Sequence, residues 1–119
     1  MPYTRISITK ELDEKTEKEL INRIGAAINN IPEKIPQFTM VELCDSSKIY
    51  LGGEKREGAG YIEIKYYGHF PYEQRKAVAE DAIKAVSELA EIPVELIYLT
   101  ITEVDSWGIM GGYTDSEHN

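Results

Sequence analysis

The sequence predicts an α/β domain in which two tandem β-α-β units form a four-stranded mixed sheet with two helices on one face. The order strand, helix, helix stop and strand occurs twice along the chain. A shift of 58 residues also superposes five identical residues, namely Tyr3, Ile6, Lys18, Ala27 and Glu33 on Tyr61, Ile64, Lys76, Ala85 and Glu91. Because crossovers between parallel strands are right-handed, each unit places its helix on the same side of the sheet.

The first repeat, residues 2–59, begins with a strand and a helix. Residues 3–8 alternate in character, which is typical of a strand with one buried face. Asp13 offers an N-cap to the helix, and Pro32 and Pro36 end it. The apolar stripe of this helix recurs at helical spacing in Leu20, Ile24, Ile28 and Ile31.

The second repeat, residues 60–112, follows the same plan. Residues 61–67 alternate as a strand, and Pro71 suits the first turn of the helix that follows. This helix stops at Ile92 and Pro93. Its apolar stripe consists of Val78, Ala82, Val86 and Leu89.

Each repeat ends in a second strand and a glycine-containing closing segment. Residues 38–43 supply this strand in the first repeat, and residues 96–104, the most β-rich stretch of the chain, supply it in the second. Segments 49–53 and 107–112 close the two halves. The polar tail, residues 113–119, is predicted to be disordered.

The face of the sheet away from the helices is predicted to be polar. Arg5 and Ser7 in the first strand, and Glu63 and Lys65 in the third, lie on this side of the alternation. Such residues are too polar for a core. We expect this face to line a wet space shared between subunits.

Length and composition fit one domain of 119 residues and exclude several classes of function. The formal net charge of -8 argues against nucleic-acid binding, which requires a basic surface. No apolar run has the length of a membrane span, and no signal-peptide pattern opens the chain. Cys44 is the only cysteine, so no internal disulfide can form. The expected location is the cytoplasm.

Pro2 is the leading candidate for a catalytic residue. Removal of the initiator methionine would leave its nitrogen as a free secondary amine, and an α-amino group titrates near pH 8. Burial or a nearby cation lowers that pKa further, which makes the amine a usable general base. The alternative interpretation is that proline at the second position is common and has no chemical role. The sequence does not decide whether Met1 is removed.

Four motifs together resemble the tautomerase superfamily. They are Met-Pro-Tyr-x-x-Ile-x-Ile at residues 1–8, Lys-Ile-Pro-Gln-Phe at 34–38, Ile-Tyr-Leu-Gly-Gly at 49–53 and Ile-Thr-Glu-Val-Asp-Ser-Trp-Gly-Ile at 101–109. The first three-quarters are similar to macrophage migration inhibitory factor and cis-3-chloroacrylic acid dehalogenase. The second half is similar to the short 4-oxalocrotonate tautomerase chain. The resemblance covers residues 2–112 and implies a homotrimer, an amino-terminal proline base and no cofactor.

The resemblance also implies substrate-binding residues. Lys34 matches a lysine that holds the substrate carboxylate, and Tyr66 matches a residue whose backbone N–H faces the substrate. Tyr98 and Thr100 fall where the family places a tyrosine and an asparagine donated by the neighbouring subunit, and Trp107 matches an aromatic wall of the pocket. For Lys34 the alternative is a solvated loop lysine, and for the other four it is ordinary packing.

Departures from the family pattern exclude some of the reactions and substrates that the resemblance would otherwise imply. The dehalogenases carry two arginines after the third strand and a histidine where this chain has Ile28, so hydrolytic dehalogenation is not expected. Residues 58–61 replace a Cys-x-x-Cys motif, so its thiol chemistry cannot transfer. His69 replaces an arginine that binds a second carboxylate. A neutral imidazole binds a dianion poorly, so a dicarboxylate substrate is not expected.

Two further patterns carry less weight. The glycine-rich segment 52–60 lacks the Gly-Lys-Ser/Thr of a phosphate loop. It is predicted to be a mobile loop near the pocket mouth, where Lys55 and Arg56 could steer anions. His69 and His118 are too few and too far apart for a metal site.

The sequence therefore predicts a keto–enol tautomerase of small 2-keto acids such as phenylpyruvate. One alternative keeps the proline base but hydrates or decarboxylates a three-carbon acid. Another, of a different class, is a non-catalytic trimer that binds a partner through its surface; a retained Met1 would favour it.

Overall fold

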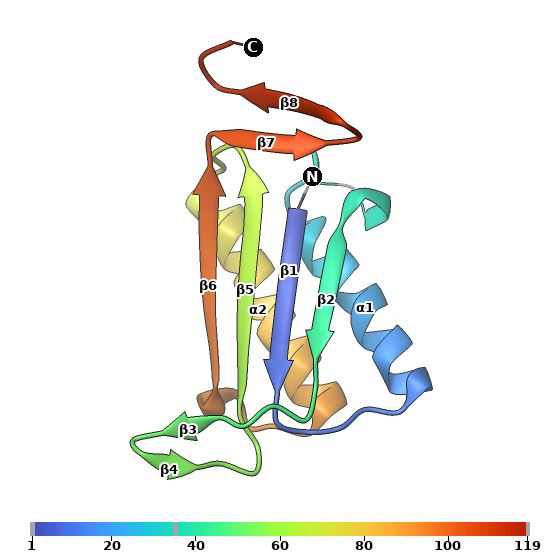
Figure 1. Ribbon diagram of the computed structural model, residues 1–119, viewed down its shortest axis with the longest axis vertical. Helices are drawn as coiled ribbons and strands as arrows, with labels where there is room; N and C mark the ends of the chain where they lie inside the picture. The colour runs from blue at the N-terminus through green and yellow to red at the C-terminus, as the bar shows by residue number, and fades with distance from the viewer. Residues whose placement is uncertain (1, 35, 119) are drawn as a thin grey trace.

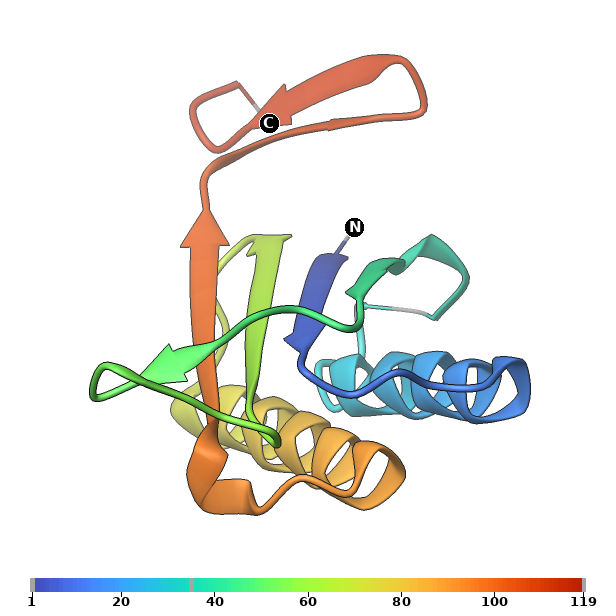
Figure 2. The same cartoon turned by 60° about the horizontal axis from the view of Figure 1, so that its bottom comes forward.

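A computed structural model of the chain describes residues 2–34 and 36–118 and contains one four-stranded sheet with both helices on the same face (Figures 1 and 2). The elements are β1 (Pro2–Ile8), α1 (Glu14–Ile28), a 3₁₀ turn (Pro36–Phe38), β2 (Met40–Cys44), β3 (Tyr50–Leu51), β4 (Glu54–Lys55), β5 (Gly60–Tyr67), α2 (Tyr72–Ala90), a second 3₁₀ turn (Val94–Leu96), β6 (Ile97–Val104), β7 (Ser106–Ile109) and β8 (Gly112–Asp115). Within the described ranges, neither helix combines the length and apolarity needed to cross a membrane.

The strand order confirms the predicted fold class. The sheet runs β2-β1-β5-β6, with β1 parallel to β2, β5 parallel to β6, and β1 antiparallel to β5. Each parallel pair is joined through a helix, so each half of the sheet is one β-α-β unit. The two central strands meet in a register that pairs Pro2 with Tyr66 and Ile8 with Gly60.

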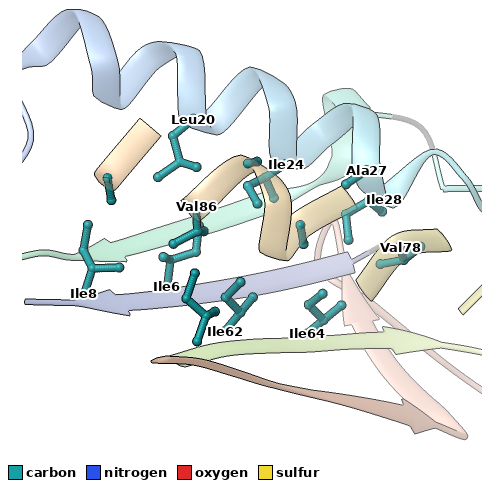
Figure 3. Close-up of a cluster of buried hydrophobic side chains, with 14 of the residues drawn as sticks. Ile6, Ile8, Leu20, Ile24, Ala27, Ile28, Ile62, Ile64, Val78 and Val86 are labelled. Atoms are coloured by element: carbon teal, nitrogen blue, oxygen red, sulfur yellow. The ribbon is translucent and has the colours of Figure 1, made fainter. Parts of the chain in front are cut away.

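The core lies between the sheet and the two helices (Figure 3). The inward side of β1 and β5 supplies isoleucines, and both helices lay their apolar stripes over them, as the alternation and the helical spacing predict. The fully buried members include Ile6, Ile8, Ile62 and Ile64 from the strands and Leu20, Ile24, Ile28, Val78, Ala82 and Val86 from the helices. Each large aliphatic side chain buried here contributes about 1.5–3 kcal/mol.

The first helix is shorter than predicted. Asp13 caps its start by accepting a hydrogen bond from the Thr16 N–H at 2.8 Å. The helix ends at Ile28, before either proline, and the side-chain amide of Asn30 donates to the carbonyl of Ala27. This side-chain hydrogen bond occupies the carbonyl of Ala27, which would accept a backbone N–H if the helix continued. Ile31 is nevertheless fully buried in the loop that follows.

Three other boundaries also differ from prediction. Phe38 belongs to a 3₁₀ turn, so β2 starts at Met40. Pro71 is the N-cap of α2 and not a residue of its first turn, because its ψ of 150° is extended. The helix stop at the end of α2 is Glu91, which adopts a left-handed φ of 55° one residue before Ile92.

Each half ends in a β-hairpin, and the two hairpins obey the same offset of 58 residues as the rest of the repeat. The turn between β3 and β4 has positive φ at Gly52 and Gly53, and the turn between β7 and β8 has positive φ at Met110 and Gly111. Two successive positive φ values suit the right-handed twist of a hairpin. The duplication therefore includes the closing segments.

The tail prediction was wrong at its start, because residues 112–115 form β8 and pair with β7. Beyond this strand, the Asp115 carboxylate accepts hydrogen bonds from the N–H groups of Glu117 and His118. The backbone N–H of Ser116 donates to the carbonyl of Asp105 at 2.9 Å. These contacts hold the residues that low hydrophobicity alone would leave disordered.

Candidate active site

Pro2 is buried at the start of β1, at the end of the sheet where the β7–β8 hairpin crosses (Figure 1). A pocket of about 280 Å³ opens beside it. The pocket draws on the first two residues of β1, on the segment around the start of β2 and on the β7 hairpin. Its lining consists of Pro2, Tyr3, Phe38, Met40, Trp107, Gly108, Ile109 and Met110. The structure thus brings Pro2 and Trp107 together in a mostly apolar pocket.

Lys34 lies in the loop after α1 and is only 4% exposed. Its backbone N–H closes a turn by donating to the carbonyl of Ile31, and its ammonium donates to the carbonyl of Tyr67 at 2.8 Å. Within residues 2–34 and 36–118 it forms no ion pair. Burial lowers the pKa of Lys34 below its usual value, and the nearby Glu33 only partly opposes this effect.

Lys34 and Pro2 lie at the same end of the sheet. Pro2 pairs with Tyr66 across the β1–β5 ladder, and the carbonyl that binds the ammonium belongs to the next residue, Tyr67. Lys34 is not part of the pocket lining. A buried cation at this end of the sheet favours anions.

The side chain of Tyr66 does not line the pocket. It is fully buried on the helix side of the sheet, and its hydroxyl donates to Glu103 Oε2 at 2.9 Å. Burial, followed by this contact with a carboxylate, raises the pKa of Tyr66 well above its usual value. The backbone of Tyr66 pairs with that of Pro2, and the backbone N–H is the part of Tyr66 that the family resemblance assigned to substrate binding.

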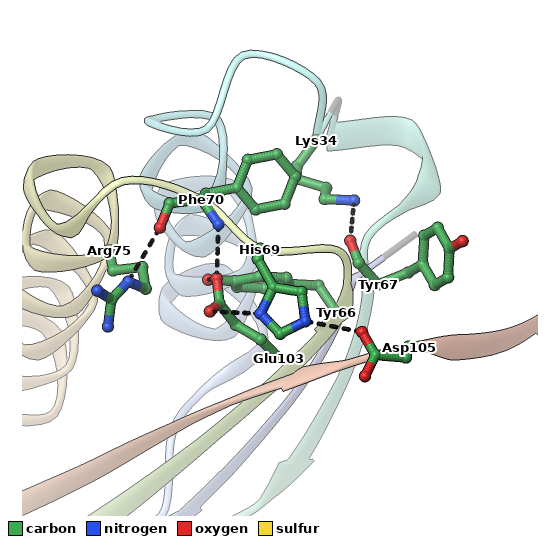
Figure 4. A network of polar contacts seen from close by, with 8 residues as sticks. All are labelled: Lys34, Tyr66, Tyr67, His69, Phe70, Arg75, Glu103 and Asp105. Atoms are coloured by element: carbon green, nitrogen blue, oxygen red, sulfur yellow. Dashed lines mark hydrogen bonds and ion pairs between the residues drawn. The ribbon is translucent and has the colours of Figure 1, made fainter. Parts of the chain in front are cut away.

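Glu103, which the sequence analysis missed, is the centre of a polar network beneath this end of the sheet (Figure 4). Its Oε2 also accepts the backbone N–H of Phe70 at 2.9 Å, and its Oε1 lies 3.3 Å from His69 Nδ1. Burial acts to raise the pKa of Glu103, but the hydrogen bonds from Phe70 and Tyr66 outweigh it and hold the pKa below its usual value. One signal was available in the sequence. Side chains alternate between the two faces of a strand, and Glu103 falls on the same inward face of β6 as Ile97, Leu99 and Ile101.

His69 bridges two carboxylates at the surface. Its Nε2 lies 2.7 Å from Asp105 Oδ1, and its Nδ1 faces Glu103. The hydrogen bond to Asp105 is the main reason why the pKa of His69 is raised. Since both partners are anions, the positive charge of His69 is already compensated and offers little to a second substrate carboxylate.

Tyr98 and Thr100 lie far from Pro2 in the same chain. Tyr98 pairs with Tyr61, which pairs with Ser7, five residues along β1 from Pro2. At about 3.4 Å per residue, this register places Tyr98 about 17 Å along the sheet from Pro2. Thr100 pairs with Glu63, which pairs with Arg5, so it lies about 10 Å along the sheet from Pro2. Tyr98 is 59% exposed beside the β3 hairpin, and the Thr100 hydroxyl lies 2.8 Å from the hydroxyl of Tyr61. One chain therefore does not bring these two residues to its own proline.

Lys55 and Arg56 are distant from Pro2 of the same chain. Strand β4, which contains Lys55, lies at the end of the sheet opposite the amino terminus (Figure 1), so the glycine-rich segment does not flank the pocket of its own chain. They line a separate polar hollow of about 530 Å³ together with Lys48 and residues of the turn after β2. Arg56 is also engaged within its own hairpin, 3.8 Å from Glu54.

Comparison with solved structures identifies the fold. The chain is similar to MIF2 from Leishmania major, with a TM-score of 0.84 and 22% identity over 95% of this chain and 97% of that one. It is also similar to Pt0534 inactivated by 2-oxo-3-pentynoate, with a TM-score of 0.83 and 19% identity over 97% of this chain and 96% of that one. The F6 fused 4-OT, an asymmetric trimer, gives a TM-score of 0.81 and 15% identity over 92% of this chain and 94% of that one.

The sequence itself matches no family model and no curated protein. At identities below 25% the structural likeness establishes the fold. The chain has the fold of these MIF and fused 4-OT structures, as its motifs predicted, built from two tandem β-α-β units.

Proposed function

From this fold, and from a buried Pro2 that lines an apolar pocket, we propose that the chain is a cofactor-independent tautomerase. Its substrate is a small 2-keto acid of the phenylpyruvate kind, and Pro2 is the general base. The observation that carries the proposal is the position of Pro2, which lines an apolar pocket. The buried ammonium of Lys34 lies at the same end of the sheet, outside the pocket lining. Inactivation of the similar Pt0534 by a 2-oxo acid gives independent support for this substrate class.

The base requires removal of Met1, because an amide nitrogen is not basic. A free α-amino group titrates near pH 8, and both burial and the nearby Lys34 ammonium lower that pKa. Pro2 then takes a proton from the carbon beside the carbonyl and returns it at the other end of the enol system. A well-placed base of this kind contributes about 10²–10⁴-fold in rate.

Lys34 supplies the charge that holds the substrate. In the proposed complex, one of its free N–H groups donates to the substrate carboxylate while the contact with Tyr67 keeps the ammonium in place. Trp107 and its apolar neighbours exclude water from the reacting carbon.

We propose that the site is completed in a homotrimer. Along the sheet, Tyr98 lies about 17 Å and Thr100 about 10 Å from Pro2 of the same chain, so in this proposal both residues serve a proline of another subunit. The similar F6 fused 4-OT is a trimer. In this arrangement the exposed Tyr98 of one subunit closes the pocket of the next.

The test combines intact-mass measurement with a tautomerase assay on the enol of phenylpyruvate. We expect a mass without Met1, measurable turnover, and a loss of about 10²-fold or more in Pro2→Ala. Pro93→Ala is the matched control, since Pro93 is exposed and distant from the pocket. Unchanged turnover in a folded Pro2→Ala protein would refute the proposal. Turnover of a propiolate-type acid without tautomerisation would favour the hydratase, and a retained Met1 without turnover would favour the binding protein.

A further inference from the structure

Two aromatic rings and one carbonyl hold the ammonium of Lys34. The nitrogen lies 5.0 Å from the centre of the Phe70 ring and 5.7 Å from that of the Tyr66 ring, and it donates to the carbonyl of Tyr67 (Figure 4). Both distances fall within the range of a cation–π contact. The position of this cation therefore depends on where the two rings are held.

The two rings come from different parts of the chain. Tyr66 lies on β5, whereas Phe70 lies in the loop that leads to α2, and their centroids are 5.6 Å apart in an edge-to-face arrangement. Gly68 allows the loop to pass close to its own aromatic ring: its φ is +101°, and an added Cβ would lie 3.1 Å from Phe70. A ring carried by such a loop needs an anchor.

Glu103 provides that anchor with a single oxygen. Its Oε2 accepts the hydroxyl of Tyr66 and the backbone N–H of Phe70, each at 2.9 Å. Arg75 holds the other side of the loop, because its Nε donates to the carbonyl of Phe70 at 3.1 Å. Hydrogen bonds to a carboxylate are stronger than neutral ones, so this arrangement fixes both rings relative to each other.

Glu103 does not act on Lys34 directly. The two residues, both inside the described ranges, share no hydrogen bond or ion pair. The Glu103 carboxylate contacts His69, Tyr66 and the N–H of Phe70. The nearby charge that acts on the pKa of Lys34 is that of Glu33, and not that of Glu103. The contacts that connect Glu103 to the ammonium are therefore those of the two rings.

We infer that Glu103 is a positioning residue. Its two hydrogen bonds clamp the rings of Tyr66 and Phe70, and these rings hold the ammonium of Lys34 where it binds the substrate carboxylate. The inference rests on the proposed function, in which Lys34 binds that carboxylate. Loss of the clamp frees the Phe70 loop and lets the ammonium move. Since carboxylate binding contributes to the ground state and the transition state alike, the expected result is a higher KM at nearly constant kcat.

The experiment is a double-mutant cycle of Glu103→Gln and Lys34→Met, measured as KM and kcat on the enol substrate. We expect Glu103→Gln to raise KM by about five- to tenfold in the wild-type background and to have no effect on KM in the Lys34→Met background. Tyr66→Phe, which keeps the ring and removes the clamped hydroxyl, should raise KM in the same direction. Asp105→Asn is the matched control, because it removes a carboxylate that contacts His69 and neither ring.

A second readout does not depend on activity. The ε-CH₂ protons of Lys34 lie near two ring faces, so their NMR signals should be shifted upfield by ring currents in the wild type. We expect this shift to shrink in Glu103→Gln and in Phe70→Leu and to persist in Asp105→Asn. An unchanged shift in Glu103→Gln overturns the inference, whatever the activity.

The outcomes separate this inference from the proposed function. If Lys34→Met raises KM but Glu103→Gln does not, the role of Lys34 stands and the positioning role of Glu103 is refuted. If Glu103→Gln raises KM equally in both backgrounds, its effect is general and the inference is again refuted. If Lys34→Met leaves KM unchanged, the carboxylate role of Lys34 fails, and the inference falls with it.

Discussion

Replacing Lys34 with methionine should make the protein more stable while weakening substrate binding. Lys34 is 4% exposed and has no anionic partner within the described ranges. Methionine has a similar length and fills the same space without a charge. The substitution removes a hydrogen bond from a charged group, worth about 1.5–3 kcal/mol, and contacts with two rings, worth about 0.5–2 kcal/mol. It also removes the cost of burying an ammonium, which is several kcal/mol.

The lowered pKa of Lys34 shows that burial is the largest effect on its charge. Burial disfavours the ammonium, and the nearby Glu33 only partly opposes this effect. We therefore expect Lys34→Met to raise the free energy of unfolding by about 1 kcal/mol at pH 7, which is the low end of the gains seen when buried ionic groups become apolar. For a chain of this length, that gain corresponds to about 4 °C in melting temperature.

The gain should depend on pH with a defined sign. Because the folded pKa of Lys34 lies below the unfolded value of 10.5, the unfolded chain binds more protons between the two, and the wild type gains stability as pH rises through that interval. The advantage of Lys34→Met should therefore be full at pH 7 and shrink towards pH 10.5. The assay is guanidinium unfolding at fixed protein concentration, with Lys84→Met on α2 as a control. A Lys34→Met protein that loses 2 kcal/mol or more at pH 7 would refute this reasoning.

Three further predictions follow from the same geometry. Met110→Gly should stabilise the protein by about 0.5–1 kcal/mol in thermal unfolding, because Met110 has a φ of +52° and is 87% exposed; a lower melting temperature would contradict this. The pKa of His69 is raised in the folded state, so its contact with Asp105 should stabilise the protein fully below pH 6.5 and lose that effect as pH rises through the folded pKa. Asp105→Asn should reduce this pH dependence, since Glu103 still contacts His69, and an unchanged profile would contradict a stabilising contact with Asp105. Finally, mixing equal amounts of Pro2→Ala and Tyr98→Ala subunits should restore about a quarter of wild-type activity, because in random trimers about a quarter of the shared pockets combine an intact Pro2 with an intact Tyr98. No recovery of activity would show that the pockets are not shared.

The fold could be predicted almost completely from the sequence, because its signals are local and repeated. The alternation in β1 and β5 and the stripes of α1 and α2 fixed which faces are buried. The errors occurred where single side chains decide a boundary. The side chain of Asn30 binds the carbonyl of Ala27 at the end of α1, before the prolines. The carboxylate of Asp115 binds the backbone N–H of Glu117, in a segment whose composition predicts disorder.

The candidate site was less accessible to sequence reasoning. Pro2, Lys34 and Trp107 carry chemical or family signals, and the structure places them at one end of the sheet. The only signal for Glu103 was its inward phase in β6, and no signal pointed to Phe70, because their role arises from a loop and a strand that meet in three dimensions. The same limit applies to Lys55, whose distance from Pro2 depends on the path of the first hairpin.

The most direct test of the account is the titration of the Pro2 nitrogen, followed by ¹⁵N NMR in protein labelled at proline. Only an amino-terminal proline has a nitrogen that titrates, so the signal is unambiguous among the five prolines of the chain. We predict a mature protein without Met1 in which this nitrogen loses its proton below pH 8. A nitrogen that stays protonated above about pH 9, or that never titrates because Met1 remains attached, would contradict the assignment of Pro2 as the base.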